Sequence, residues 1–254
     1  YAGKIKAVGS NGRPVGYLMQ SPFEFREHGR SGLPISSLFP HTSKFADDLC
    51  VLRSLYTDTA AHASGCLQMN TGSIFIGRPS LGAWVSYGLG TENRNLPGFV
   101  VMCPGGYPIV ATQNWRSSFL PGACQGTYLD TNQVEVDRLI ANIRNTRLTL
   151  QEQRRQLDLV KKMNELHAQE RQHAPLLEAR IQSFELAYRM QSEAAEAFDL
   201  KRETQHVQEA YGTGIHGRQL LTARRLIERG VRFIQIWSGA GQPWDNHDGL
   251  QAQH

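Results

Sequence analysis

The chain has 254 residues, of which 40% are hydrophobic and 9% aromatic, so it is long enough to bury a core as one large α/β domain or two smaller ones. Its net charge is only +4, and Lys and Arg are interleaved with Asp and Glu, which gives nucleic-acid binding little electrostatic support. No apolar run approaches the roughly 20 residues that span a bilayer, and the four cysteines lack the Cys-x-x-Cys spacing of a zinc or redox motif.

The N-terminal part of the chain is predicted to change from an irregular segment to regular secondary structure near Ser37. Residues 1–34 are rich in Gly, Pro and Ser and show no sustained periodicity, which predicts a surface segment that needs something to pack on. Ordered structure is expected to begin with a short helix over residues 37–48. The apolar run at residues 50–55 is typical of a strand.

The next segments alternate between helix and strand signals. A polar loop leads into a helical stretch that ends near Thr71-Gly72, and Pro79-Ser80 begins another helix. Pro97-Gly98 precedes an apolar strand over residues 99–102, which Pro104 stops. This alternation of helices and strands, separated by Gly and Pro, predicts an α/β fold.

Residues 134–211 differ from the preceding segments in composition and periodicity: they contain almost no Gly, and their apolar residues recur with a helical period. Thr149 and Glu152 stand at capping-box spacing, and Pro175 can begin the next helix. We interpret this region as a helical insertion in a single domain of residues 1–254: a hairpin followed by a third helix, with one face packed on the sheet. The predicted apolar faces are Leu159, Met163 and Leu166 on the first helix and Leu177, Ile181, Phe184 and Tyr188 on the second.

A helix over residues 217–229, with Gly230 as its C-terminal cap, passes directly into a strand over residues 231–237. Both faces of this strand are largely apolar, which is typical of a parallel strand covered by helices. A glycine turn then leads to Trp244-Asp245-Asn246-His247-Asp248. Because ligands of open α/β sheets bind beyond the carboxyl ends of strands, we expect Asp245 and His247 to lie at a functional site.

Asp245 and His247 supply a carboxylate and an imidazole two residues apart, so both can turn toward one divalent metal ion. Such an ion polarises an ester oxygen or lowers the pKa of a bound water. The alternative is that Asp245 caps a following helix and His247 is a surface histidine; the loop alone favours neither interpretation.

The second candidate is the segment of residues 62–72, which opens a helix whose N-terminus favours an anion. Ser64 or His62 is placed to meet a phosphate or sulfate there. The segment is explained equally well as a capped helix start.

Several short motifs together resemble the domain of unknown function 1501 family, over essentially the whole chain. They are Phe39-Pro40-His41-Thr42, Asn70-Thr71-Gly72-Ser73, Gly77-Arg78-Pro79-Ser80-Leu81-Gly82, Leu96-Pro97-Gly98-Phe99-Val100, Arg224-Arg225-Leu226-Ile227-Glu228-Arg229-Gly230-Val231-Arg232-Phe233 and Trp244-Asp245-Asn246-His247. That family is sulfatase-like and is grouped with the alkaline phosphatase superfamily. The resemblance implies a doubly wound, mostly parallel α/β sheet with a metal-centred hydrolase site.

The resemblance also implies roles for individual residues. Asp245 and His247 look like the Asp and His metal ligands at the end of a strand, with zinc, calcium or another divalent ion as the cofactor. His62 stands where related sulfatases place their nucleophile, but His62-Ala63-Ser64-Gly65-Cys66 replaces the Cys-x-Pro/Ser-x-Arg motif, which argues against formylglycine chemistry. Cys66 stands where many members have a second histidine.

Family members carry an export signal, an N-terminal metal-binding strand and a C-terminal Asp-His pair, so the resemblance implies an exported, periplasmic protein of which this chain is a fragment lacking both ends. Two functions are therefore expected. The first is a metal-dependent hydrolase of small anionic sulfate or phosphate esters, with Asp245 and His247 as metal ligands and His62 or Ser64 facing the anion. The second is a non-catalytic member that acts as a binding or scaffold protein through its helical layer.

Overall fold

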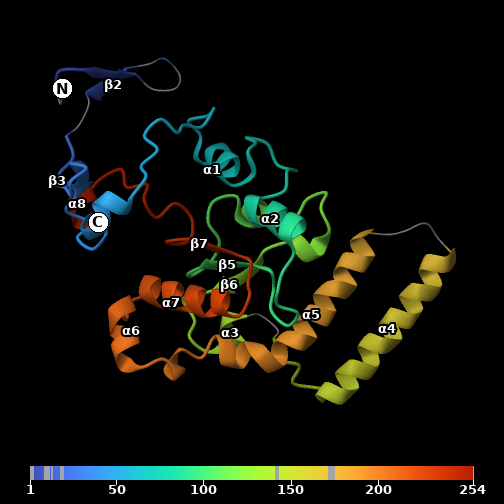
Figure 1. Ribbon diagram of the computed structural model, residues 1–254. Coiled ribbons are helices and arrows are strands. Elements are labelled where there is room, and N and C mark those ends of the chain that lie inside the picture. Colours follow the sequence, from blue (N-terminus) through green and yellow to red (C-terminus); the bar gives the residue numbers. More distant parts are fainter. Residues whose placement is uncertain are drawn as a thin grey trace. The chain divides into compact units, whose positions relative to one another are not determined.

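The computed structural model describes residues 3–8, 12, 14–17, 20–140, 143–170 and 175–253. The chain divides into two compact units (Figure 1). Residues 1–60 and 244–254 form the first unit, and residues 61–243 form the second.

The first unit is built from two small antiparallel hairpins and short helices, namely β1 (Lys6–Val8), β2 (Pro14–Tyr17), β3 (Phe25–His28), β4 (Leu33–Ser36), η1 (Thr42–Asp48) and α8 (Leu250–Gln253). In the turn between β3 and β4, the Asp47 carboxylate accepts hydrogen bonds from the backbone N–H groups of Arg30 and Ser31 at 2.9 and 2.8 Å. These two bonds hold the pKa of Asp47 below its usual value.

Two predictions for this unit are wrong. Residues 25–36 already form a hairpin, because strand pairing supplies order that the Gly- and Pro-rich sequence does not signal. Residues 50–55 form no strand, and Leu52 and Leu55 are exposed. A strand needs a neighbour for its backbone groups, and no described strand pairs with this run.

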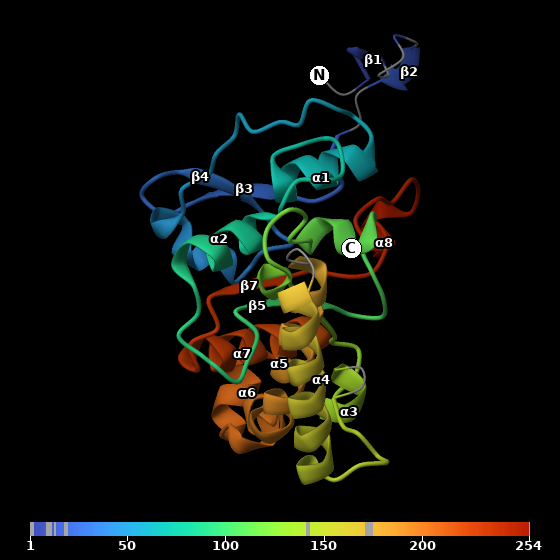
Figure 2. The same cartoon turned by 90° about the vertical axis from the view of Figure 1, so that its right-hand side faces the viewer.

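The second unit is a mixed α/β layer structure (Figure 2). Its elements are α1 (His62–Thr71), α2 (Leu81–Leu89), β5 (Phe99–Cys103), η2 (Ala111–Trp115), η3 (Gly122–Cys124), β6 (Thr127–Asp130), α3 (Val136–Leu139), α4 (Leu150–Glu170), α5 (Pro175–Ala197), η4 (Leu200–Arg202), α6 (Gln205–Tyr211), α7 (Ile215–Glu228) and β7 (Phe233–Ile236). Three of the strands form one parallel sheet in the order β6-β5-β7.

Strand β5 lies at the centre of the sheet, and all five of its residues are buried. Val100 and Met102 point into a large apolar cluster that includes side chains of α3, α5 and α7. Phe99 and Val101 point to the opposite face, where they pack with Trp115. Helices therefore cover both faces of the sheet, which explains why every residue of β5 is apolar.

The helix boundaries follow local signals in the sequence. Ser80 caps α2 by accepting a hydrogen bond from the Ala83 N–H at 3.3 Å. At the end of α7, Gly230 takes a positive φ of 82°, and its N–H donates to the Ile227 carbonyl at 2.9 Å. The predicted start of α2 is confirmed, whereas α7 ends one residue earlier than predicted, with Arg229 as its C-cap and Gly230 directly after it.

The described residues of 134–211 form helices and loops, as the period predicts. Thr149 and Glu152 form the capping box: the Thr149 N–H donates to the Glu152 carboxylate at 2.8 Å, and the Glu152 N–H donates to the Thr149 hydroxyl at 3.3 Å. Helix α5 starts at Pro175. Its contacts with the apolar cluster come from Leu186, Met190 and Ala197.

The predicted packing face of α4 is wrong. Its apolar residues Leu159, Met163 and Leu166 are more than half exposed. Helix α4 instead meets α5 through polar contacts: the Arg154 guanidinium donates to both carboxylate oxygens of Glu185 at 2.8 and 2.6 Å, and Gln191 donates to Gln153 at 2.8 Å. Arg154 lowers the pKa of Glu185 through this bidentate contact.

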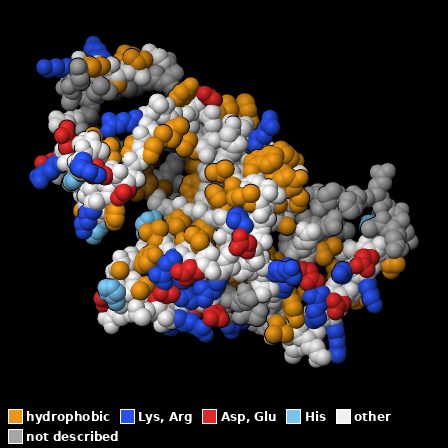
Figure 3. All heavy atoms as spheres, in the orientation of Figure 1, with side chains coloured by type: hydrophobic (Ala, Val, Ile, Leu, Met, Phe, Trp, Pro, Cys, Tyr) orange, Lys and Arg blue, Asp and Glu red, His pale blue; other side chains and the backbone are white. Residues whose placement is uncertain are grey.

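Hydrophobic side chains also gather on the outer surface over α2, which Figure 3 shows in orange. Trp84 packs edge-on against Tyr87 and Phe119, with ring centroids 6.3 and 5.8 Å apart. No helix of the described residues is long and apolar enough to cross a membrane.

Candidate functional site

The Asp245-Asn246-His247 loop belongs to the first unit and precedes the short helix α8. His247 Nε2 lies 3.3 Å from Asp245 Oδ2. The His247 side chain is 84% exposed, whereas the Asp245 side chain is 30% exposed. The two predicted ligands therefore lie together, and the imidazole is open to an incoming ion.

Asn246 adds a feature that the sequence did not signal. Its amide nitrogen is hydrogen-bonded to Gln253 of α8. Its Oδ1 oxygen is buried and has no hydrogen-bond partner among the residues that the structure describes. A buried acceptor without a donor costs about 1–3 kcal/mol, and a bound water molecule or a metal ion would offset this cost.

These residues fit part of a metal site. A carboxylate oxygen, an amide oxygen and an imidazole nitrogen are all ligands of divalent cations in proteins. Over the described part of the chain, however, no three His, Cys, Asp or Glu side chains gather around one point. Since β7 belongs to the second unit, the place of Asp245 and His247 beyond its carboxyl end stays a prediction.

The second candidate segment forms α1, which begins at His62. The N-cap residue is Ala61, whose own side chain forms no capping hydrogen bond, and the first turn carries no acidic residue. The first-turn N–H groups and the helix dipole therefore favour an anion. His62 is exposed and Ser64 is half-buried. His62 and His247 belong to different units, so their expected shared cleft is also still a prediction.

A polar network connects α1 to the sheet. The Gln235 amide of β7 donates to Asn70 Oδ1 at 2.6 Å, and the Asn70 amide donates to the Cys66 carbonyl at 2.8 Å. The Cys66 thiol donates to Oδ1 of the fully buried Asn114 at 3.3 Å. The sequence gives one signal of this network, which we did not predict: Gln235 is the single polar residue in the strand Phe233–Ile236.

Burial keeps the Cys66 thiol protonated. Burial raises the pKa of its thiol, and the hydrogen bond with Asn70 offsets only part of this effect. Burial and the nearby Asp130 carboxylate raise the pKa of Cys103 to about 11. These thiols are therefore poor nucleophiles near neutral pH.

We expect iodoacetamide at pH 7.5 to modify the exposed Cys50 first and Cys66 and Cys103 much more slowly. The measurement is time-resolved alkylation followed by peptide mass spectrometry. The same reaction in urea is the control, because unfolding should make all four cysteines react alike. Equal rates for Cys50 and Cys66 in the native protein would show that Cys66 is not held in this network.

Comparison with known proteins agrees with this reading of the motifs. The model of the family described as "Protein of unknown function (DUF1501)" matches residues 3–254. The chain belongs to this family. No curated protein and no solved structure matches the chain. As a DUF1501 member, the chain contains Asp245, His247, His62 and Ser64 within the matched region.

Proposed function

We propose that this DUF1501 member is a metal-dependent hydrolase of small sulfate or phosphate esters, exported to the periplasm, with a doubly wound, sulfatase-like sheet. The observation that carries the proposal is the Asp245-Asn246-His247 loop. The loop brings a carboxylate within 3.3 Å of an exposed imidazole, and the intervening Asn246 has a buried amide oxygen with no partner among the described residues.

The proposed roles follow from the chemistry of these groups. Asp245 and His247 would hold a divalent cation, and Asn246 Oδ1 is a further oxygen that suits such an ion. A bound cation polarises an ester oxygen or lowers the pKa of water. His62 and Ser64, in the first turn of α1, would face the negatively charged sulfate or phosphate group.

The test measures metal content and ester hydrolysis of the full-length protein. We expect the wild type to retain a divalent metal after dialysis and to hydrolyse 4-nitrophenyl sulfate or 4-nitrophenyl phosphate. Asp245→Asn and His247→Ala should each lower metal affinity by about tenfold to a hundredfold or more, because each removes a ligand. His62→Ala should lower turnover with little change in melting temperature, because an exposed residue contributes little to the core.

Asp248→Asn is the matched control, because it removes an exposed carboxylate from the same loop. It should leave metal content and turnover unchanged. Equal metal content in the wild type and in the Asp245 and His247 variants would contradict the metal site. If His62→Ala mainly destabilises the fold, His62 is a structural residue.

The second candidate is a non-catalytic binding or scaffold protein, and one observation favours it. Helix α4 exposes Leu159, Met163 and Leu166 on its surface, where an apolar face offers area to a partner. Absence of both bound metal and ester hydrolysis in the full-length protein would favour this function over the hydrolase.

A further inference from the structure

A cavity of about 530 Å³ opens on the second unit at the amino end of the parallel sheet. Its walls come from residues 91–98 before β5, from residues 122–127, which lead into β6, and from α5. This volume falls within the range of small-molecule sites. Open α/β sheets bind their substrates at the opposite, carboxyl ends of the strands, so a ligand of this cavity has a role apart from ester hydrolysis.

The inside of the cavity is apolar. The lining residues that are buried carry no polar side chain, and they are Leu96, Pro97, Gly126, Ile140, Ile143 and Met190. Leu186 and Ala187 of α5 extend this lining toward the surface. A cavity with apolar walls holds ordered water poorly, so an apolar group that fills it gains free energy.

The apolar lining is aliphatic. No aromatic side chain is found among the described residues that line the cavity. A flat ring such as a nucleobase gains much of its binding energy by stacking on aromatic side chains. Aliphatic side chains and the flexible thioether chain of Met190 pack instead against a hydrocarbon chain. The lining therefore favours an aliphatic ligand.

The charged groups of the cavity lie at its mouth and are positive. Among the described residues that line it, Arg94 and Arg189 are the only charged ones, and both are exposed. Glu92, two residues before Arg94, and Glu185, one turn before Arg189, are outside the lining. Each of these carboxylates accepts hydrogen bonds from an arginine outside the cavity. An anionic head group at the mouth is therefore matched by charge.

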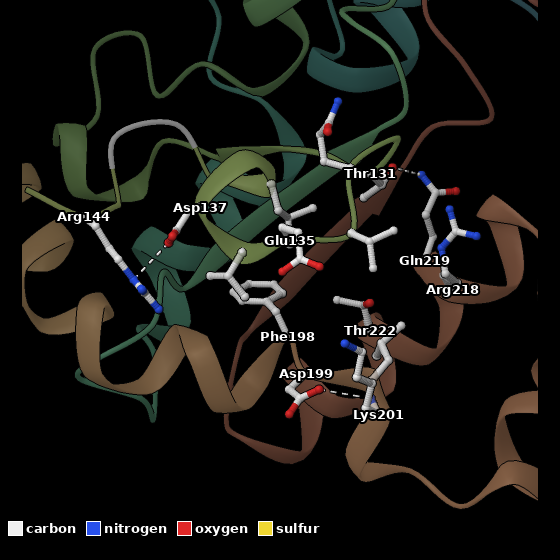
Figure 4. A pocket seen from close by; sticks show the side chains of 15 residues that line it. Thr131, Glu135, Asp137, Arg144, Phe198, Asp199, Lys201, Arg218, Gln219 and Thr222 are labelled. Carbon is white, nitrogen blue, oxygen red and sulfur yellow. Dashed lines mark hydrogen bonds and ion pairs between the residues drawn. The ribbon is translucent and has the colours of Figure 1, made fainter. Parts of the chain in front are cut away.

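A second cavity, beside β6, η4 and α7, has a different charge distribution (Figure 4). It is lined by three acidic and three basic side chains, namely Glu135, Asp137, Asp199, Arg144, Lys201 and Arg218. These charges balance, so that cavity favours neither an anion nor a cation. The apolar cavity at the amino end of the sheet, by contrast, selects for the sign of the charge.

We infer that the cavity at the amino end of the sheet binds an aliphatic chain with one anionic head group. The chain lies along the lining of Leu96, Ile143 and Met190. The head group contacts Arg94 and Arg189. Free fatty acids and alkyl sulfates share this chemistry, and the experiment distinguishes them. The site does not depend on the proposed metal loop.

The test is isothermal titration calorimetry of the full-length protein with butyrate, hexanoate, octanoate and decanoate, all below their micelle concentrations. We expect a single site whose affinity rises by about threefold for each added methylene, because each methylene buries apolar area. Decyl sulfate shows which head group is preferred. Decyltrimethylammonium carries the same chain with a positive charge, and it should bind about tenfold or more weakly than the preferred anion.

Ala187→Phe tests the place of the chain. Ala187 is exposed on α5, so the added ring occupies the cavity without disturbing the core. It should weaken decanoate binding by about tenfold or more through steric exclusion. Ala210→Phe is the matched control, because it adds the same ring to an exposed position of α6. It should leave decanoate binding unchanged.

Arg94→Gln and Arg189→Gln test the head group. Each should weaken decanoate binding by about threefold to tenfold and leave the gain per methylene unchanged, because the arginines contact only the head group. Arg155→Gln, at an exposed position of α4, is the control for charge. Asp245→Asn should also leave binding unchanged, which separates this site from the proposed hydrolase. Circular dichroism of each variant verifies the fold.

Three results would overturn the inference. They are an affinity that does not rise with chain length, binding of decyltrimethylammonium as tight as that of decanoate and decyl sulfate, and equal affinity in the wild type and in the folded Ala187, Arg94 and Arg189 variants.

Discussion

Arg225→Ala is expected to lower the free energy of unfolding by about 3–5 kcal/mol, because it removes a buried cation from a complete set of partners. The Arg225 side chain is 5% exposed. Its guanidinium donates to the Ala197 carbonyl at 3.0 Å, to the Glu196 carbonyl at 2.8 Å, and to Glu203. The substitution removes the Arg225 donors from both backbone carbonyls and one of the two arginines that pair with Glu203, which keeps its contact with Arg224.

The hydrogen bonds of Arg225 connect α7 to the end of α5 and to the segment before α6. Urea denaturation followed by circular dichroism measures the loss. Arg202→Ala is the matched control: its side chain is 56% exposed, so removal of its ion pairs should cost less than about 1 kcal/mol. Similar losses for the two variants would contradict the assignment of Arg225 as the buried link.

Phe99→Ala is expected to cost about 3–5 kcal/mol of stability, since it empties part of the core at the start of the central strand. Phe99 is 1% exposed and packs edge-on against Phe233, with ring centroids 5.2 Å apart. Phe119→Ala removes the same side chain from a position that is 63% exposed and should cost less than about 1 kcal/mol.

Gly82 provides a second test of this packing. A Cβ atom at Gly82 would lie 2.5 Å from Cζ of Phe99 and 2.6 Å from Cδ1 of Phe233. Gly82→Ala alone should therefore destabilise the protein by about 1–3 kcal/mol through overpacking. Combined with Phe99→Leu, the same change should cost less, because the shorter side chain leaves room. Additive losses in thermal denaturation would show that the two residues do not share this contact.

Local signals in the sequence determined the starts of several helices. Ser80 and the Thr149–Glu152 pair bond their own helix termini, so only a few neighbouring residues are involved. Gly230 acts in the same way, because a positive φ is a property of one residue. The apolar run at β5 was equally clear, since helices on both faces require apolar side chains at every position.

The candidate site could be predicted only in part. Asp245 and His247 are two residues apart, so their approach to 3.3 Å follows from the chain itself. The contact of Gln235 with Asn70, and that of Cys66 with Asn114, join residues far apart in the chain. No local pattern marks such partners, although a polar residue inside an apolar strand shows where to look.

Tertiary structure decided the remaining features. Residues 50–55 have the composition of a strand but form none, whereas the Gly- and Pro-rich residues 25–36 pair as a hairpin. Helix α4 has an apolar stripe, yet Arg154 and Gln153 make its contacts with α5. The physical reason is the same in each case. The backbone groups of a helix cap or a turn find their hydrogen-bond partners among neighbours in the chain. The backbone groups of a strand and the side chains of an apolar face need partners that distant residues supply.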